Sequence, residues 1–306
     1  MNFIHWVFAC CVIFLSAPVF SAACSGKGVE VQVLGSGGPE TQDKRASSSY
    51  LVWLAGKARV LIDAGGGAKL RFGESGAQMT DLDAIVFTHL HADHSSDFAA
   101  LIKSSYFEER SRPLPVFGPP GNERFPPLTG FVAALFGEKN GAFRYLNDYI
   151  NPNEPGGYKL QAHDVELRNQ EIGKVFSNER LHLSAINVIH GAVPALAWRV
   201  DIAGKSVVFS GDTSGENGNL ELLAQGADLL VAHNSVPEGA AGAVLELHMP
   251  PAVIGRIARD AQIKHLVLSH RMLRTLGKET QTQAAIRKLY AGPLVFADDL
   301  DCFTLQ

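Results

Sequence analysis

The sequence predicts an α/β protein with two β-sheets and helices on their outer faces, and three observations support this. Thirty glycines and fifteen prolines among 306 residues indicate many tight turns, which excludes a helical bundle. Apolar runs of strand length recur, and helical patterns lie between several of them. The expected strands are 29–34, 50–54, 60–62, 84–87, 197–202, 207–209, 229–232 and 266–268. The expected helices are 98–107, 219–224, 250–261 and 279–290.

The composition is that of a globular protein: 46% of the residues are hydrophobic, 19% are charged and the formal net charge is −4. This balance excludes a disordered chain and provides no basic field for holding nucleic acid. Four cysteines are too few for a disulfide framework or for a cysteine-rich zinc module.

The first 23 residues contain no Asp, Glu, Lys or Arg, and their apolar block is followed by the small residues Ser21, Ala22 and Ala23. This pattern predicts an export signal at 1–23 that is cleaved after Ala23, leaving one domain over 24–306. An uncleaved anchor is the alternative, because the uncharged run approaches the length that spans a bilayer. The small residues favour cleavage, so we expect a periplasmic or secreted protein without stable membrane association.

Two segments far apart in the sequence are similar to each other. Residues 51–63 and 198–212 each run through Ala-Gly-Lys into a short apolar strand and end at an aspartate, Asp63 or Asp212. Each pattern predicts a hairpin whose glycine supplies the turn. Either a common turn recurs here, or the fold has two similar β-rich halves that meet at a site.

The segment 118–158 has a different character, with six prolines, several aromatic residues and little strand pattern. A stretch of this kind within an α/β domain predicts a lid-like insertion or a pocket wall. Phe72, Phe98 and Phe107 are expected in the hydrophobic core.

The residues that carry chemistry follow a predicted strand, in the run THLHADH at 88–94. Side chains alternate in an extended segment, so His89 and His91 point the same way and can bind one metal ion. Asp93 and His94 can reach a second ion once the chain turns into the next helix. A packing role would leave three imidazoles and a carboxylate to be satisfied inside the protein. We therefore interpret this run as a metal-binding motif.

Further residues of metal-ligand type stand just past other predicted strands. They are His190, Asp212 and His270. Each alone would be an ordinary histidine or turn aspartate, but together with the first cluster they predict a two-metal site. His233 also follows a strand end and is ambiguous, with a place behind the ligands as one interpretation. The remaining strand-like histidines have no partners at ligand spacing and are expected to be structural: His163, His182 and His265.

These landmarks resemble the metallo-β-lactamase superfamily and, within it, the ribonuclease Z-like branch. The resemblance runs from Val29 to about Leu305 and implies an αββα metallo-β-lactamase sandwich, with two mixed β-sheets, outer helices and two-fold pseudosymmetry. It implies that one zinc ion is held by His89, His91 and His190, and a second by Asp93, His94 and His270, with Asp212 bridging. It further implies that Asp63 braces the ligand loop and that His248 assists the leaving group.

The expected ligands define the expected chemistry. Two zinc ions about 3.5–4 Å apart lower the pKa of a bridging water and hold an anionic ester in line. We therefore expect an extracytoplasmic binuclear zinc hydrolase that cleaves a phosphodiester or a sulfate ester through a metal-bridging hydroxide. Asp93 and His248 are the expected catalytic residues, and manganese or iron in place of zinc stays open.

The chain also departs from the ribonuclease Z pattern. An export signal heads it, no long basic arm appears, and the block 231–235 lacks the glutamate found in that branch. Exported arylsulfatases and phosphodiesterases are therefore the more similar relatives, and the expected partner is a small phosphate or sulfate ester. Nucleic acid is not expected as a partner, and a homodimer is one open arrangement. The alternatives are a ribonuclease Z-type endonuclease acting on transfer RNA 3′ ends and a non-catalytic metal-binding protein.

Cys24 and Cys302 are the cysteines that remain after cleavage. In the fold that the chain resembles, the first and last strands lie in neighbouring parts of the sheets, so a disulfide between them is expected. Closing so long a loop contributes about 4–5 kcal/mol in the chain-entropy model. The alternatives are a lipid-modified Cys24 and a free, buried Cys302.

Overall fold

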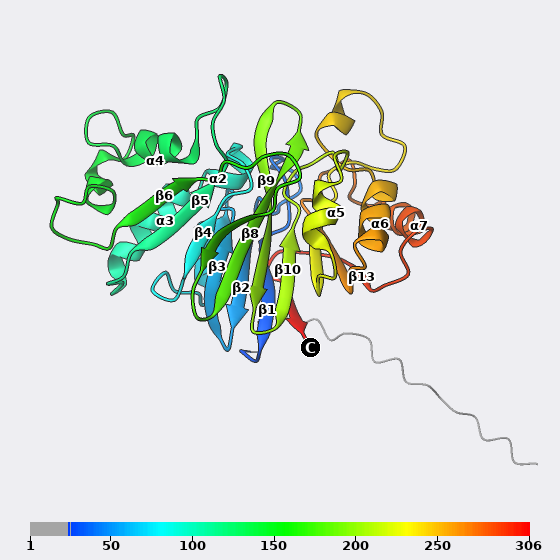
Figure 1. Cartoon of the computed structure of the whole chain (residues 1–306), viewed down its shortest axis with the longest axis horizontal. Helices are drawn as coiled ribbons and strands as arrows, with labels where there is room; N and C mark the ends of the chain where they lie inside the picture. Colours follow the sequence, from blue (N-terminus) through cyan, green and yellow to red (C-terminus); the bar gives the residue numbers. More distant parts are fainter. Residues whose placement is uncertain (1–23, 25) are drawn as a thin grey trace, which may run out of the picture.

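Two β-sheets stacked face to face form the centre of the molecule, with helices on both outer faces (Figure 1). The structure, a computed structural model, describes Cys24 and residues 26–306. The expected export signal at 1–23 lies outside these described residues. Among the residues described, no helix is long and apolar enough to cross a membrane.

Over the described part of the chain, each sheet has seven strands. The first has the order β14 (Cys302–Leu305), β1 (Val29–Gly35), β2 (Ser49–Leu54), β3 (Lys57–Ile62), β4 (Ala84–Val86), β5 (Leu114–Gly118) and β6 (Leu160–Asp164). The second has the order β13 (Leu294–Phe296), β12 (His265–Ser269), β11 (Leu229–His233), β10 (Lys205–Phe209), β9 (Val193–Ile202), β8 (Leu181–His190) and β7 (Gly173–Ser177).

The two sheets repeat one pattern. The hairpins β2–β3 and β9–β10 turn at Ala55-Gly56 and Ala203-Gly204, and these residues all have positive φ, between 47° and 75°. A two-residue turn of this kind matches the twist of the paired strands, and glycine adopts it without strain. Parallel strands follow each hairpin: β4, β5 and β6 in the first sheet, and β11, β12 and β13 in the second. The similar segments in the sequence therefore mark two similar halves.

Alternation along the strands produces the layers. Val60 and Ile62 pack between the two sheets, in the same apolar cluster as Trp198 of the second sheet. Leu61, between them in sequence, faces the other way and packs in the cluster that contains Phe98 of the outer helical layer. The molecule is thus the αββα sandwich that the resemblance implies.

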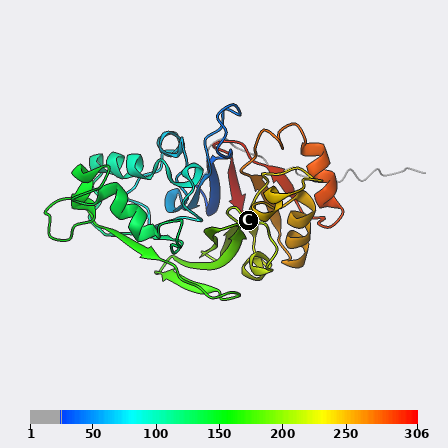
Figure 2. The ribbon, with the colours of Figure 1, turned by 90° about the horizontal axis from the view of Figure 1, so that it is seen from above.

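The helices divide between the two outer faces, as Figure 2 shows. On the side of the first sheet lie α1 (Ala68–Glu74), α2 (Ala92–Ser95), α3 (Phe98–Ser104), the 3₁₀ turns η1 (Ser105–Phe107) and η2 (Arg144–Tyr149), and α4 (Leu128–Phe136). On the side of the second lie α5 (Asn219–Ala224), the 3₁₀ turn η3 (Ala243–Glu246), α6 (Pro251–Asp260) and α7 (Glu279–Arg287). Proline suits the first position of α6 because no helical partner is lost there, and Ile254 and Ile257 of α6 pack onto the sheet.

The segment 118–158 connects the parallel strands β5 and β6. Most of it is structural, because Leu128, Val132 and Leu146 belong to the core on the outer face of the first sheet. Only the proline-rich stretch before α4 borders the predicted metal site: there the Phe125 ring lies 6.1 Å from that of His91.

Phe107 is not a core residue, and that prediction is wrong: its side chain is 80% exposed. The expected helix 98–107 ends as α-helix at Ser104 and tightens into the 3₁₀ turn η1. The hydroxyl of Ser105 bonds the carbonyl of Ile102 and the hydroxyl of Tyr158, which draws Ser105 inward. Phe107, two residues later, therefore faces solvent, whereas Phe72 and Phe98 are buried.

Cys24 and Cys302 form a disulfide with their Cα atoms 5.3 Å apart. It connects Cys24, five residues before the start of β1, with the first residue of β14, and these two strands pair antiparallel. The blue and red strands at the centre of Figure 2 are these two strands. Both ends of the described chain thus belong to one edge of the first sheet.

Candidate metal centre

The run 88–94 leaves the first sheet just beyond β4 and changes conformation halfway. His89 and His91 lie on extended chain, and the short helix α2 begins directly after His91. The turn therefore comes earlier than the sequence predicts, and it carries Asp93 and His94 away from the first two histidines. One local change from strand to helix thus separates two pairs of side chains.

The other predicted ligands stand at strand ends on the second sheet. His190 is the last residue of β8, Asp212 comes three residues after β10, and His270 comes directly after β12. His270, like Asp63 after β3, has a left-handed backbone with φ near 50–56°. Such a residue at a strand end turns the chain sharply, and Asp and His tolerate this conformation better than most residues.

Three imidazole nitrogens form a first donor set. His91 Nδ1 lies 3.1 Å from His89 Nε2 and 3.4 Å from His190 Nε2. The Nδ1 of His190 donates to the carbonyl of Leu247, and the Nδ1 of His89 faces the hydroxyl of Thr88. These bonds leave the Nε2 lone pairs of His89 and His190 free. Both lone pairs converge on His91 Nδ1, where a bound cation would relieve the repulsion between the three nitrogens.

A second donor set lies beside the first. Asp93 Oδ2 is 3.2 Å from His270 Nε2 and 3.7 Å from His94 Nε2. The His94 Nε2 atom is buried and has no hydrogen-bond partner among the described residues. Such an orphaned nitrogen is rare inside proteins and fits a metal ligand.

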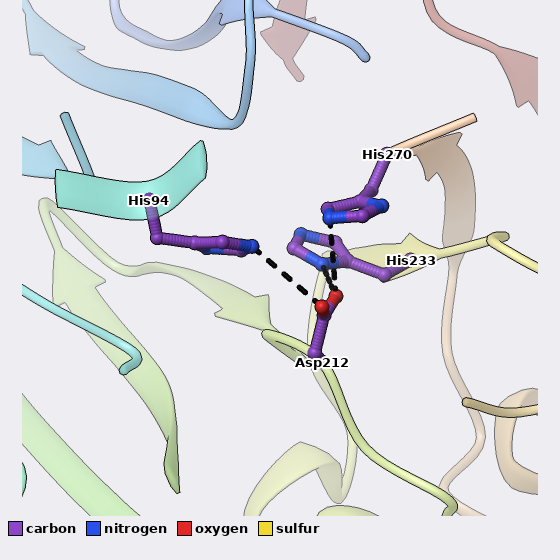
Figure 3. A group of neighbouring side chains, drawn as sticks. All are labelled: His94, Asp212, His233 and His270. Atoms are coloured by element: carbon purple, nitrogen blue, oxygen red, sulfur yellow. Dashed lines mark hydrogen bonds and ion pairs between the residues drawn. The ribbon is translucent and has the colours of Figure 1, made fainter. Parts of the chain in front are cut away.

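The carboxylate of Asp212 lies between the two sets. Its Oδ2 is 3.9 Å from His89 Nε2, 3.8 Å from His190 Nε2 and 3.7 Å from His94 Nε2, while its Oδ1 is 3.5 Å from His270 Nε2. Figure 3 shows the rings of His94, His233 and His270 directed at this carboxylate. One side chain can therefore serve two ions.

The spacing fits divalent ions. Ligand bonds of about 2.0–2.2 Å in a tetrahedron place neighbouring donor atoms about 3.3–3.6 Å apart, close to the separations found here. Each predicted metal ligand thus lies in one of the two sets: His89, His91, Asp93, His94, His190, Asp212 and His270. The arrangement brings together residues from both halves of the chain.

The two sets differ in protonation. Burial lowers the pKa of His89, His91 and His190, so the first set is neutral and its lone pairs are available. Burial alone would also lower the pKa of His94, but the carboxylates of Asp63 and Asp212 raise it well above its usual value. The second set therefore holds a proton that an ion would displace.

Asp63 braces the ligand loop from behind. Its Oδ1 accepts from the backbone N–H of Thr88 at 2.7 Å, and its Oδ2 accepts from the Thr88 hydroxyl and from His94 Nδ1, both at 2.8 Å. Once His94 has lost the proton that an ion displaces, this bond keeps the remaining N–H on Nδ1 and leaves the Nε2 lone pair facing the second set. Asp63 thus stands where the resemblance implies, and Thr88 is an additional brace.

His248 lies at the rim, in the loop that leads to α6. Its Nδ1 is 3.9 Å from Asp212 Oδ2, and its ring centroid is 5.4 Å from that of His190. Burial lowers the pKa of His248 to about 4, so the ring is neutral at neutral pH. A small apolar cluster lies on the His91 side and consists of Leu90, Pro119, Pro120, Phe125, Pro126, Val193 and Pro194.

Sequence reasoning missed the residues that hold the ligands from the core. Tyr50 bonds His233, and the hydroxyl of Ser235 lies 2.9 Å from His270 Nδ1. Tyr50 lies in an apolar strand, where its hydroxyl needs a hydrogen-bond partner. This need is the feature of the sequence that could have pointed to a polar contact in the core. The histidines expected to be structural are exposed and lie away from the site: His163, His182 and His265.

A larger surface pocket lies at the opposite end of the strands of the second sheet, around the start of β10. Two of its basic side chains are already paired: Arg180 with Asp83, and Lys264 with Asp228. Nothing in it resembles the converging donors at the strand ends, so the chemistry belongs to the metal centre.

Comparison with known proteins agrees with this geometry. The model of the Metallo-beta-lactamase superfamily matches residues 43–254. Ribonuclease Z of Mycolicibacterium paratuberculosis is 29% identical over 286 residues, which cover 89% of this chain and 96% of that protein. The crystal structure of human tRNase Z, short form, has a TM-score of 0.70 at 19% identity, over 90% of this chain and 98% of that one. A diphosphatase of the PhnP family has a TM-score of 0.61 at 21% identity, over 91% and 98%.

Fold and sequence together define the class: the chain belongs to the metallo-β-lactamase superfamily, a superfamily of metal-dependent hydrolases. The relatives named ribonuclease Z place it in the ribonuclease Z-like branch. Because proteins of that name are among the similar ones, the expectation that nucleic acid is not a partner finds no support.

Proposed function

We propose that this chain is a binuclear metal-dependent hydrolase that cleaves phosphodiesters, with sulfate esters as the alternative substrate class. The observation that carries the proposal is the position of Asp212 Oδ2, within 3.7–3.9 Å of histidine nitrogens from both donor sets. Two divalent ions bound there, zinc in the first instance, lower the pKa of a shared water and polarise an anionic ester.

The chain supplies orientation and a hydrogen-bond donor at the leaving group. Asp93 is ionised at neutral pH: burial alone would raise its pKa, but His270 and His94 lower it to about 2. The neutral ring of His248 faces the same space, with its buried Nδ1 unpaired in the described structure. This ring donates an N–H to the leaving oxygen as negative charge develops there.

The apolar side chains beside His91 support an ester with an apolar or aromatic organic group. The Phe125 ring lies 6.1 Å from that of His91, and the apolar cluster around Phe125 contains no charged side chain. The disulfide between Cys24 and Cys302 supports an oxidising, extracytoplasmic location, since such bonds persist outside the cytosol. The proposed setting is therefore the periplasm or the exterior of the cell.

A second candidate is ribonuclease Z-type cleavage at the 3′ end of precursor transfer RNA. The similarity to ribonuclease Z over 89% of the chain favours it. Against it, the block 231–235 has Asn234 in place of a glutamate, and the Asn234 amide bonds the carbonyl of Val236.

Assays on the purified, metal-loaded protein separate these candidates. The panel contains a bis-aryl phosphate, an aryl sulfate, a cyclic nucleotide and a precursor transfer RNA, with metal content measured in parallel. We expect about two ions per chain, turnover of the bis-aryl phosphate, and loss of both activity and metal in Asp212→Ala. Cleavage of the RNA alone would favour the second candidate, and a fully loaded protein inert on all four would overturn the proposal.

A further inference from the structure

A chain of buried hydrogen bonds leads from the core to the shared carboxylate. The hydroxyl of Tyr50 lies 3.0 Å from the hydroxyl of Ser269 and 3.0 Å from His233 Nε2. His233 Nδ1 lies 2.7 Å from Asp212 Oδ1. All four side chains are buried, and they come from β2, β11, β12 and the loop after β10. The route therefore crosses between the two sheets.

The proton positions along this chain follow from its chemistry. An ionised carboxylate can only accept hydrogen bonds, so the nitrogen of His233 that lies 2.7 Å from Asp212 Oδ1 carries the N–H; this atom is Nδ1. The other ring nitrogen, Nε2, is in hydrogen-bond contact with the hydroxyl of Tyr50. The same hydroxyl donates to Ser269 Oγ.

We propose that Tyr50 and His233 are positioning residues that set the bridging geometry of Asp212. The bond from His233 holds Oδ1 and leaves Oδ2 directed between the two donor sets. The contact with the Tyr50 hydroxyl engages the other nitrogen of His233 and holds the ring in place. This inference rests on the proposed metal centre.

The same bonds explain why His233 is not itself a ligand. Its ring stacks on His270 with centroids 4.8 Å apart, and its donor atoms lie close enough to those of His94, Asp212 and His270 to hold an ion with them. Both of its nitrogens are already engaged, however. Asp93 is therefore left to complete the second set. Without the Tyr50 hydroxyl, the Nε2 of His233 is unpaired and the ring is held at Nδ1 alone.

The test compares Tyr50→Phe with Tyr158→Phe. Tyr158 is a matched control, because its buried hydroxyl also bonds a serine, Ser105, at 2.8 Å but lies away from the metal centre. The readouts are zinc affinity by chelator competition, the visible spectrum of the Co²⁺-substituted protein, and thermal unfolding. For Tyr50→Phe we expect a 10–100-fold weaker affinity for the more weakly held ion and an altered Co²⁺ spectrum.

For Tyr158→Phe we expect a comparable loss of thermal stability with both metal readouts unchanged. Two tyrosine variants that are alike in zinc affinity and in spectrum would overturn the inference. A parent protein that binds no ions would overturn the proposed function as well. If the parent protein binds two ions and Tyr50→Phe binds them with the same affinity and spectrum, this inference alone is overturned.

A rescue experiment on His233 gives an independent readout. Asparagine can present an amide N–H near the position of the lost Nδ1, whereas alanine cannot. We expect His233→Asn to retain zinc affinity closer to that of the parent than His233→Ala does. With a small ester as substrate, kcat should fall in both variants while KM changes less than twofold. Equal loss of affinity in the two variants would contradict a positioning role.

Discussion

Replacing Asp63 by asparagine tests how the tautomer of a ligand is fixed. Asp63 is fully buried and accepts three hydrogen bonds, one on Oδ1 and two on Oδ2. The amide group of asparagine cannot replace Oδ1, because it would face the fixed backbone N–H of Thr88. The amide group therefore takes the position of Oδ2. There the Thr88 hydroxyl can rotate to accept from it, but two N–H groups would face each other if His94 kept its proton on Nδ1. His94 must move its proton to Nε2, the atom that faces the second donor set.

The expected magnitude follows from this forced change. One charge-assisted hydrogen bond contributes about 1.5–3 kcal/mol, which corresponds to about a 10–150-fold loss in affinity for the second ion. The first donor set keeps its three nitrogens, so Asp63→Asn should hold one ion tightly and one weakly. Chelator competition and mass spectrometry under native conditions measure the two affinities and the stoichiometry.

The matched control is Asp83→Asn. Asp83 is also a buried carboxylate, bonded by Arg112 and Arg180, but it precedes β4 at the far end of the strand from the site. We expect this variant to lose stability and to keep both ions. An Asp63→Asn protein that binds two ions within about twofold of the parent affinity would refute the tautomer argument. Equal metal loss in the two variants would also refute it.

Three further predictions concern protons, the leaving group and the disulfide. Because Asp63 and Asp212 raise the pKa of His94, its charge stabilises the metal-free protein below about pH 6.5 and this contribution is lost as pH rises through the raised pKa. Zinc binding should therefore release protons, and zinc should bind more tightly at pH 8 than at pH 6. Calorimetry in two buffers measures both quantities, and an affinity that does not change with pH would contradict the prediction. His248→Ala should lower kcat by about 10²–10⁴ with metal content intact, and the loss should shrink for a nitrophenyl leaving group; equal losses for good and poor leaving groups would indicate a binding role. Replacing Cys24 and Cys302 by serine should lower the free energy of unfolding by about 2–5 kcal/mol in urea titrations and leave both ions bound.

The sequence predicts most of this fold because the alternation of side chains along strands and the residue preferences of tight turns are local properties of the chain. The hairpins follow from Ala-Gly turns between apolar strands, and the helices α5, α6 and α7 begin within a residue of their expected positions. The strands that it misses are β5, β6, β7 and β13. Strand β5 contains Pro115, β6 and β7 lie at sheet edges with several exposed side chains, and β13 is an edge strand of three residues. None of these strands shows the long apolar run of a central strand.

The site divides in the same way between local and tertiary information. The run 88–94 can be interpreted from the sequence because four candidate ligands fall within six residues, and the change from strand to helix separates them into two pairs. Tyr50 and Ser235 carry no such pattern. Their partners are more than thirty residues away in the chain, so only the packing of the two sheets shows what their hydroxyls contact.

The pairing of β14 with β1 also bears on the risk of aggregation. Strand β1 is buried along all seven of its residues, and β14 covers its outer edge from Val29 to Gln32. An uncovered edge of this kind is a template for pairing with the same strand of another molecule. The disulfide holds Cys302, the first residue of that cover. Removing the last few residues, or loosening β14 by reducing the disulfide, would therefore expose the edge of β1. Edge-to-edge aggregation should then occur under conditions in which the domain is still folded.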